Sequence, residues 1–320
     1  MGVLSAGSKW LIVSGDDFGL SSEVNAGILT AHREGILTNV SFMVNGPARE
    51  EAVSMAKETP TLGVGLHLTL VLGRSTLPFR ELPGLVDAAG HFSSDPVKAG
   101  MRYFFDKRLH ASLLRECRAQ IEVFLATGLS LSHIDGHLNI HLHPTILTLL
   151  LQLAIEYPIR ALRLTHENLW TSLTLDPTDA IRKVREGAIF SLLSLYARRK
   201  LKAAGIIFSD YLFGLHQSGN VNEAYLLGLI PHLRNGVTEL YCHPSLAQGS
   251  GSWLSALSYS LSGEVAALTS PRVKEALQQA GVSLISYRDL TEASVQQSAI
   301  SRQPRIKRTK SGGEGQSLKT

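Results

Sequence analysis

Two neighbouring acids, Asp16 and Asp17, follow a short apolar run in the stretch LIVSGDDFGLS. Adjacent carboxylates repel each other, and burying either one without a partner costs free energy. A bound cation removes most of that cost, because it neutralises one carboxylate while the other stays free to act as a base. The pair therefore indicates metal-assisted chemistry, although either acid alone could also be an N-terminal helix residue.

Histidines supply further ligands of the kind that a divalent metal ion takes. The segment SHIDGHLNIHLHP, together with GVGLHLTL and ELYCHPS, contains the candidates His133, Asp135, His137, His141, His143, His67 and His243. One carboxylate and two imidazoles form a common metal triad that leaves positions open for water and substrate. We take Asp17, His67 and His137 as the candidate ligands, one from each of three segments.

Three further residues have candidate roles beside the metal. Asp16 would accept a proton from a water that the metal activates, and His243, which titrates near neutral pH, would protonate the leaving group. Arg163, in RALRLTHEN, would keep Asp16 ionised. Each role has a structural alternative, because His243 could line the pocket and Arg163 could form an ordinary ion pair.

The other residues of the histidine motifs are candidates for substrate contact or for support of a ligand. Asp135 either orients a histidine or lines the pocket as an acid, and His141 is assigned to the same group. His67, flanked by leucines, could by itself be a hydrogen-bonded core histidine. His143 stands beside Pro144 and could simply begin a helix.

Short apolar segments that alternate with amphipathic ones must position these residues. The predicted strands are Trp10–Ser14, Val40–Val44, Val64–Leu70, Leu131–Ile134, Ala161–Thr165, Ile206–Phe213, Glu239–Cys242 and Ser283–Ser286. Predicted helices lie between most of them, which indicates a parallel sheet. Eight strands favour an α/β fold of the TIM-like (β/α)-barrel type, regular or irregular. In such a barrel the C-terminal strand ends converge on one mouth, so distant motifs can meet there.

We expect a single barrel domain over residues 1–290. Residues 72–106 are too long for an ordinary βα loop and are predicted to form part of the pocket. Residues 177–204 are predicted to be a packing helix, with a membrane-facing or acyl-chain-facing helix as the alternative. Residues 291–320 hold six basic and two acidic residues and few apolar ones, which predicts a basic, disordered tail.

The formal net charge of +4 does not indicate a nucleic-acid partner, because the tail accounts for all of it. A solubilising tail is our interpretation, and weak attraction to anionic lipid headgroups is the alternative. No apolar run is long enough to span a membrane, and we find no secretory signal. Two distant cysteines add no disulfide framework, so we expect a cytoplasmic protein, with contact to the inner face of the membrane left open. No oligomeric state is indicated.

Five motifs, in this order between about residues 10 and 290, resemble the YdjC-like carbohydrate deacetylase family: VSGDDFGLS, MVNG, GVGLHL, HIDGH and ELYCHP. The resemblance implies a β/α-barrel enzyme that removes the acetyl group from an N-acetylated sugar with one divalent metal ion. It implies metal ligands at Asp17, His67 and His137, a base at Asp16 and an acid at His243. Zinc suits an Asp-His-His set by ligand softness, whereas magnesium is often assigned to this family.

Four further stretches look like the branch of this family that is associated with hopanoid biosynthesis: GLHLTLVLGRSTLP, LPGLVDAAGHF, AGMRYFF and LFGLHQSG. The branch implies an N-acetylglucosaminyl head group on a bacteriohopanetetrol lipid as substrate, which an apolar rim from residues 72–106 or 187–213 would suit. Leu138 and Asn139 depart from the family, in which many relatives carry further histidines or aromatic residues there. This departure leaves the substrate contacts open.

Three other functions are alternatives. The protein could deacetylate soluble chitooligosaccharides, or it could be a glycosidase in which Asp16 and Asp135 flank the sugar bond. It could also be a barrel that binds sugar or lipid without catalysis. Chelation separates the first from the second, because a glycosidase of this type should survive removal of the metal.

Overall fold

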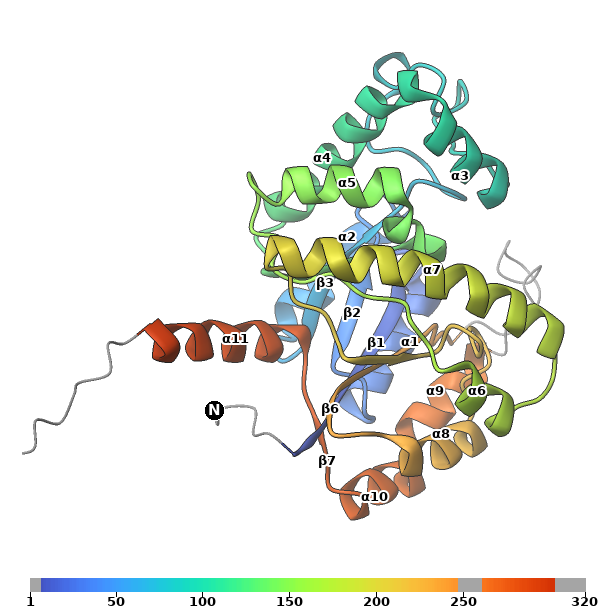
Figure 1. The fold of residues 1–320 in the computed structure, drawn as a ribbon, viewed down its shortest axis with the longest axis vertical. Coiled ribbons are helices and arrows are strands. Elements are labelled where there is room, and N and C mark those ends of the chain that lie inside the picture. Colours follow the sequence, from blue (N-terminus) through green and yellow to red (C-terminus); the bar gives the residue numbers. More distant parts are fainter. Residues whose placement is uncertain (1–6, 247–260, 303–320) are drawn as a thin grey trace, which may run out of the picture.

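The fold comes from a computed structural model that describes residues 7–246 and 261–302. One curled sheet has the strand order β4-β3-β2-β1-β6-β5, with β7 paired to β1, and every pairing is parallel. The strands are β1 (Lys9–Phe18), β2 (Asn39–Phe42), β3 (Gly63–Leu68), β4 (Leu131–Gly136), β5 (Tyr211–Phe213), β6 (Gly236–Cys242) and β7 (Val282–Leu284). Helices cover the outside of this sheet (Figure 1). The predicted α/β, TIM-like fold is therefore confirmed.

The wall of the barrel is irregular between β4 and β5. Only isolated bridges connect these two edge strands, and they pair Ile134 with Leu162, Ala161 with Ile207, and Glu167 with Leu212. We call residues 161–167 the seam. The predicted strand Ala161–Thr165 is wrong, because a tight turn in which the His166 amide donates to the Leu164 carbonyl (2.9 Å) interrupts the ladder. The predicted strand Ile206–Phe213 shortens to β5, and of its earlier residues Ile207 pairs through an isolated bridge with Ala161.

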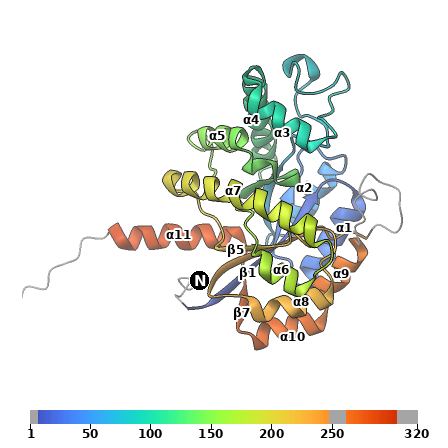
Figure 2. The ribbon, with the colours of Figure 1, turned by 45° about the vertical axis from the view of Figure 1, so that its right-hand side comes forward.

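Helices follow most strands, as the alternating pattern predicts. They are α1 (Ser22–Arg33), α2 (Arg49–Glu58), α3 (Pro96–Phe105), α4 (His110–Ala126), α5 (Pro144–Leu153), α6 (Leu169–Leu175), α7 (Ala180–Ala204), α8 (Glu223–Leu229), α9 (Leu261–Thr269), α10 (Pro271–Gln279) and α11 (Tyr287–Arg302). Four short 3-10 helices are η1 (Phe79–Glu81), η2 (Lys107–Leu109), η3 (His137–Leu142) and η4 (Ile230–His232). The long helix α7 crosses the front of the sheet beside α5 (Figures 1 and 2).

Strand β1 shows how the sheet divides its two faces. Successive side chains of a strand point to opposite faces. Leu11 and Val13 belong to the large core between sheet and helices, whereas Ile12 belongs to a smaller core with Tyr287. Ser14, on the same face as Ile12, hydrogen-bonds a buried glutamate of β6. The barrel interior is therefore apolar at the N-terminal strand ends and polar towards the C-terminal ends.

Residues 72–106 follow β3 and form a lobe with α3 and α4 at the top of the molecule (Figure 1). The hydroxyl of Tyr103 donates to the Leu70 carbonyl (2.6 Å), which ties α3 to the end of β3. The buried carboxylate of Glu116, on α4, accepts the amides of Thr76 and Leu77 (2.7 and 3.0 Å). The insert is therefore fastened at both ends to the strand face that carries the candidate site.

The C-terminal segment corrects one predicted boundary. A disordered tail was expected from residue 291, but α11 continues as a helix to Arg302. Ser286 and Asp289 cap its start, since the Asp289 carboxylate accepts the amide and the hydroxyl of Ser286 (2.8 and 2.7 Å). The rest of the predicted tail, residues 303–320, lies outside the described residues. Within the described ranges, no helix is long and apolar enough to cross a membrane.

Candidate active site

A bulge in β1 brings both neighbouring acids to the same side of the sheet. In the register with β2, Gly15 pairs with Val40 and Phe18 with Phe42, so two residues of β1 oppose one of β2. Asp17 adopts a φ of 65° within this bulge. A regular strand would send consecutive side chains to opposite faces, and a bulge re-aims one of them. Both carboxylates therefore enter the barrel, where each is 3% exposed.

The flanking glycines serve different purposes. Gly19 has a φ of 96°, a conformation that suits glycine and turns the chain out of β1. Gly15 instead allows close packing, because a Cβ atom there would lie 2.9 Å from Leu37 Cδ1. Gly15 therefore serves packing rather than a turn, and the positive φ of the bulge falls on Asp17.

The three predicted ligands meet at the C-terminal strand ends. Asp17 Oδ1 lies 3.0 Å from His137 Nδ1 and 3.3 Å from His67 Nε2. The three residues are buried, and each offers a ligand atom within 4.8 Å of the others. Metal–ligand bonds of about 2.1 Å place neighbouring ligand atoms roughly 3.0–3.4 Å apart, so these separations fit one divalent ion.

The charges around the triad also fit a cation. Among the described residues, the interior holds the carboxylates of Asp16, Asp17, Asp135 and Glu239 against one guanidinium, that of Arg163. Burial opposes protonation of the nearby imidazole of His67, but the carboxylates of Asp135 and Asp17 outweigh it and raise the pKa of His67 to about 10. The cluster thus attracts positive charge. Asp17, His67 and His137 are suited to hold a divalent metal ion.

Asp135 supports a ligand rather than lining the pocket. Its Oδ1 accepts from His67 Nδ1 at 2.8 Å, so Nε2 of that imidazole faces Asp17. Its Oδ2 accepts from the Ser41 hydroxyl (2.8 Å) and lies 2.5 Å from Arg163 Nη1. A carboxylate behind a ligating histidine fixes the tautomer and orientation of the imidazole. Of the two roles considered for Asp135, the geometry favours the orienting one.

Arg163 organises the acids beneath the triad. Its guanidinium contacts Asp16 at two points, Nη1 to Oδ2 at 2.7 Å and Nη2 to Oδ1 at 2.8 Å, and its Nε donates to Glu239 at 3.0 Å. The ring of Tyr241 lies 4.7 Å from its Cζ atom. Paired donors in a fixed plane hold a carboxylate in one orientation. The structure thus places Arg163 against Asp16, as the sequence predicts.

His243 lies just past β6, at the same end of the barrel. Its amide donates to the buried carboxylate of Glu264 (2.5 Å), and its Nδ1 lies 3.5 Å from the Ser218 hydroxyl. Burial lowers the pKa of His243, while the negative charges of Asp17 and Asp16 act in the opposite direction. The buried imidazole of His243 therefore lies within electrostatic reach of both acids of β1.

The remaining histidines of the motif do not join the triad. His141 Nε2 donates to the Arg163 carbonyl (3.0 Å), and burial lowers its pKa to about 4. It supports the backbone of the seam rather than a metal ligand. His133 stacks on Tyr287 at 4.3 Å. His143 is the N-cap residue of α5, so the alternative that it begins a helix is confirmed.

Sequence reasoning missed the acid on β6. Glu239 is fully buried and accepts hydrogen bonds from Ser14 (2.8 Å), Arg163 (3.0 Å) and the Tyr287 hydroxyl (2.6 Å). An acid inside the apolar strand TELYC was the available signal, since buried acids need partners. Ser41 and Tyr241, which contact Asp135 and Arg163, carried no comparable signal.

Next to the acids, the insert borders a largely apolar cavity of about 440 Å³. It is lined by Leu20, Met43, Asn45, Gly46, Pro47, Leu72, Gly73, Arg74, His91, Phe92 and Ser94. Leu20 follows the acid pair by three residues, and the insert supplies six of the lining positions. The cavity therefore lies between the segments that follow β1 and β2 and the 72–106 lobe.

The fold and the cluster define a parallel β/α-barrel protein whose strand ends carry a buried Asp-His-His set. The profile of the YdjC-like protein family matches residues 10–279, and the chain belongs to this family.

Curated relatives extend over almost the whole chain. A carbohydrate deacetylase of Geobacillus stearothermophilus is 31% identical over 88% of this chain and 98% of its own length. A carbohydrate deacetylase of Vibrio parahaemolyticus is 30% identical over 89% of this chain and 97% of its own length. A third, from Brevibacillus brevis, is 45% identical, but that alignment spans 47% of this chain and 58% of the relative.

A solved structure shares the fold. It is described, provisionally, as a cellobiose-phosphate cleavage protein of Enterococcus faecalis V583. It superposes with a TM-score of 0.66 at 27% identity, covering 88% of this chain and 99% of the other. The likeness therefore covers the barrel as a whole rather than one motif.

Proposed function

We propose that the protein is a carbohydrate deacetylase that hydrolyses the N-acetyl group of an amino sugar with the help of one divalent metal ion. Two relatives of that name, 30–31% identical over nearly their whole length, support the activity. The observation that carries the metal-dependent part is the buried set Asp17, His67 and His137, with Asp135 behind His67.

Each side chain then has a defined task. Asp17, His67 and His137 would hold zinc or magnesium, which when bound polarises the acetyl carbonyl and makes a water more acidic. Asp16 accepts the proton of the attacking water, and the two-point contact with Arg163 holds its carboxylate in one orientation. His243 gives a proton to the departing amine.

The structure disfavours the alternative that the protein is a glycosidase, because Asp135 is not available as the second carboxyl group. It requires two carboxyl groups that both reach the sugar bond. Asp135 is fully buried, and both of its oxygens are engaged by His67, Ser41 and Arg163. Asp135 therefore orients His67 instead of flanking a sugar bond, which disfavours a glycosidase.

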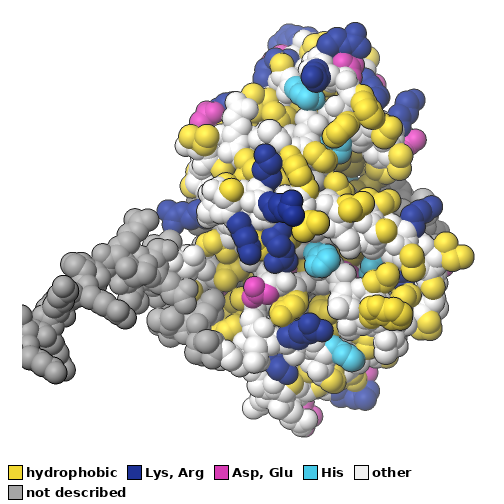
Figure 3. Space-filling model, in the orientation of Figure 1, with side chains coloured by type: hydrophobic (Ala, Val, Ile, Leu, Met, Phe, Trp, Pro, Cys, Tyr) yellow, Lys and Arg dark blue, Asp and Glu magenta, His cyan; other side chains and the backbone are white. Residues whose placement is uncertain are grey.

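We further propose a glycolipid substrate, an N-acetylglucosaminyl head group on a hopanoid, in a cytoplasmic protein that contacts the inner face of the membrane. The support is an outward apolar face on α7, where Ile181, Leu192 and Leu195 are 87%, 72% and 55% exposed. Hydrophobic side chains are spread over the face that α7 crosses (Figure 3). The insert adds Phe104 and Phe105, both exposed. Soluble chitooligosaccharides are the alternative substrate.

Acetate release tests the activity and the substrate together. The purified protein is incubated with an N-acetylglucosaminyl glycolipid or with chitooligosaccharides, with and without a chelator, and acetate is measured. The proposal expects release that stops on chelation and returns when metal is restored. Release of sugar instead of acetate would contradict the proposal, and so would acetate release that a chelator does not reduce. The ratio of the acetate release rates from the two substrates shows whether the enzyme prefers a lipid-linked or a soluble sugar.

A further inference from the structure

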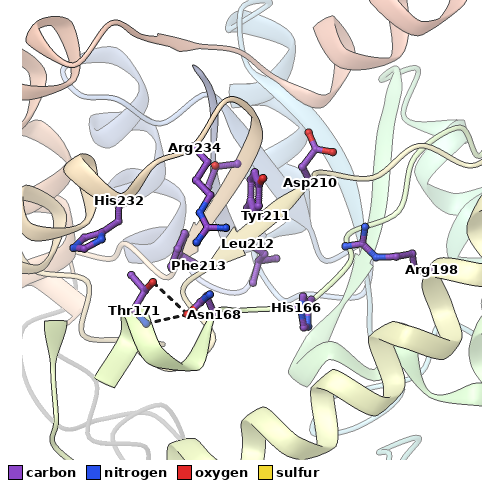
Figure 4. A pocket seen from close by; sticks show the side chains of 11 residues that line it. His166, Asn168, Thr171, Arg198, Asp210, Tyr211, Leu212, Phe213, His232 and Arg234 are labelled. Carbon is purple, nitrogen blue, oxygen red and sulfur yellow. Dashed lines mark hydrogen bonds between the residues drawn. The ribbon is translucent and has the colours of Figure 1, made fainter. Parts of the chain in front are cut away.

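A second, polar cavity lies on the outside of the barrel. It has a volume of about 380 Å³ and is bounded by β5, the end of the seam, α7 and the segment that leads into β6. Figure 4 shows its lining, which includes the cationic or polar side chains of Arg198, Arg234, His166, His232, Asn168 and Thr171. None of these residues belongs to the Asp-His-His cluster or to its supporting network.

Its two arginines are held without a carboxylate partner. Among the described residues, neither Arg198 nor Arg234 forms an ion pair or hydrogen bond with an acid. Arg198 packs over Phe208 (5.2 Å from Cζ to the ring centre) and Arg234 over Tyr211 (5.8 Å). They reach the cavity from opposite sides (Figure 4). Stacking on an aromatic ring orders a guanidinium while leaving its N–H groups free for an anion.

The other polar groups of the cavity add donors. Asn168 Oδ1 accepts the amide and the hydroxyl of Thr171 (3.0 and 3.3 Å; Figure 4), so its amide nitrogen is not part of that cap. His166 and His232 contribute imidazoles. The single acid of the lining, Asp210, already accepts the Val237 amide (2.9 Å). The cavity thus offers many more donors than free acceptors.

We propose that this cavity binds a small ligand that carries a phosphate or a similar multiply charged oxyanion. Two guanidinium groups that reach the cavity from opposite sides can each bind different oxygens of one phosphate. A carboxylate has only two oxygens, so this arrangement suits a phosphate better than a carboxylate. The cavity volume leaves room for a sugar-sized body beside the anion. The ligand is either a free phosphate ester or the headgroup of an anionic lipid, and the chemistry of recognition is the same for both.

Inorganic phosphate and a hexose phosphate are the probes for the free ligand, titrated by calorimetry at low salt against the full chain. We expect saturable binding that Arg198→Gln and Arg234→Gln each weaken at least tenfold. Arg199→Gln is the matched control, because Arg199 neighbours Arg198 on α7, is exposed and does not line the cavity. Equal weakening by all three variants, or no binding of any probe, overturns the proposal.

A further variant keeps the test valid if an arginine variant misfolds. Asn168→Asp retains a side-chain oxygen that can cap α6 but places a negative charge in the cavity, so it should weaken phosphate binding by a similar factor. Vesicles containing phosphatidic acid form the second arm. Binding to vesicles but not to free phosphate, abolished by Arg198→Gln and Arg234→Gln, assigns the ligand to a lipid headgroup. Vesicle binding that these variants do not change, without binding of free phosphate, overturns the proposal.

Discussion

Asp16 and Asp17 are neighbours in the chain but belong to different parts of the site. Asp17 faces the two imidazoles of the triad, whereas Asp16 faces the guanidinium of Arg163. The bulge in β1 makes this separation, because it re-aims one side chain of the pair. The apparent conflict between adjacent carboxylates is therefore resolved by two different positive partners.

Changing each acid to its amide should have different effects on metal binding and activity. Asp16→Asn should keep its metal and lose activity by about 100-fold or more, the usual contribution of a general base. Asp17→Asn should lose metal as well as activity, because an amide is a poorer ligand than a carboxylate. Metal content by mass spectrometry and acetate release by enzymatic assay separate these outcomes. An Asp16→Asn variant with full activity would remove Asp16 from the proposed mechanism.

Arg163 should matter to stability more than a surface arginine does. Arg163→Met leaves the carboxylates of Asp16, Asp135 and Glu239 buried without their cation, a loss of about 3–5 kcal/mol in unfolding free energy. Arg118→Met, which breaks the exposed pair with Glu156, is the control and should change the unfolding free energy far less, because water screens an exposed ion pair. Urea unfolding measures both. Similar losses for the two variants would contradict the organising role of Arg163.

At the residue scale, the sequence predicts which side chains meet at the strand ends, but not the contacts that support them. Asp17, His67 and His137 could be found because each carries a metal-binding group at the end of an apolar run. Their relation to Asp135 and Glu239 depends on strand register and on the bulge, and neither is visible in a local pattern. A positive φ at Asp17 is likewise a property of the folded sheet.

At the scale of elements, β4 carries a buried histidine that should make stability depend on pH. Burial lowers the pKa of His133 to about 3, and its imidazole lies within hydrogen-bond distance of Ser132, Asn39 and Ser41. Since the unfolded chain binds this proton near pH 6.5, the neutral form stabilises the fold above that pH. The stability is lost as the pH falls towards 3.

Lowering the pH from 7 to 5 should therefore cost about 2 kcal/mol of unfolding free energy through His133 alone. His141, whose pKa burial also lowers, adds to the loss in the same direction. Chemical unfolding at a series of pH values measures the slope. In a folded His133→Gln variant the slope should be smaller, and an unchanged slope would show that this histidine is not held neutral.

The elements themselves could be predicted where one face is buried in a repeating pattern. β1, β3 and β6 follow such apolar runs, and proline at the start of α5 marks a helix. The seam could not be predicted, because its apolar residues resemble a strand while its backbone pairs only at single residues. The cap formed by Ser286 and Asp289 is not recognised from the sequence, which predicts a disordered tail from residue 291, where α11 continues to Arg302.

At the scale of the whole molecule, α7 carries exposed large apolar side chains on its outer face, among them Ile181, Leu192 and Leu195. Globular proteins usually keep large apolar side chains out of such exposed rows, and a row of them indicates contact with lipid or protein. In the proposed function this face rests on a bilayer. Leu192→Glu should then reduce binding to anionic vesicles severalfold in a sedimentation assay, while deacetylation of a soluble substrate stays unchanged.

Ile155→Glu is the matched control, because Ile155 is 87% exposed but lies at the end of α5 rather than on α7. It should leave vesicle binding as it is. Equal effects of the two variants would point to a general response to added negative charge and would contradict a membrane role for α7.

The seam should make the wall between β4 and β5 the part of the barrel that unfolds locally most easily. With only single bridges between β4 and β5, the amides of this wall should exchange with deuterium sooner than those of β1, which is paired along most of its length with β6. The polar cavity lies against the end of this seam, at Asn168 and Leu212. An anion bound there by Arg198 and Arg234 would connect α7 to the segment before β6 as a reversible, noncovalent crosslink. Its binding should slow the exchange of amide hydrogens along the whole wall.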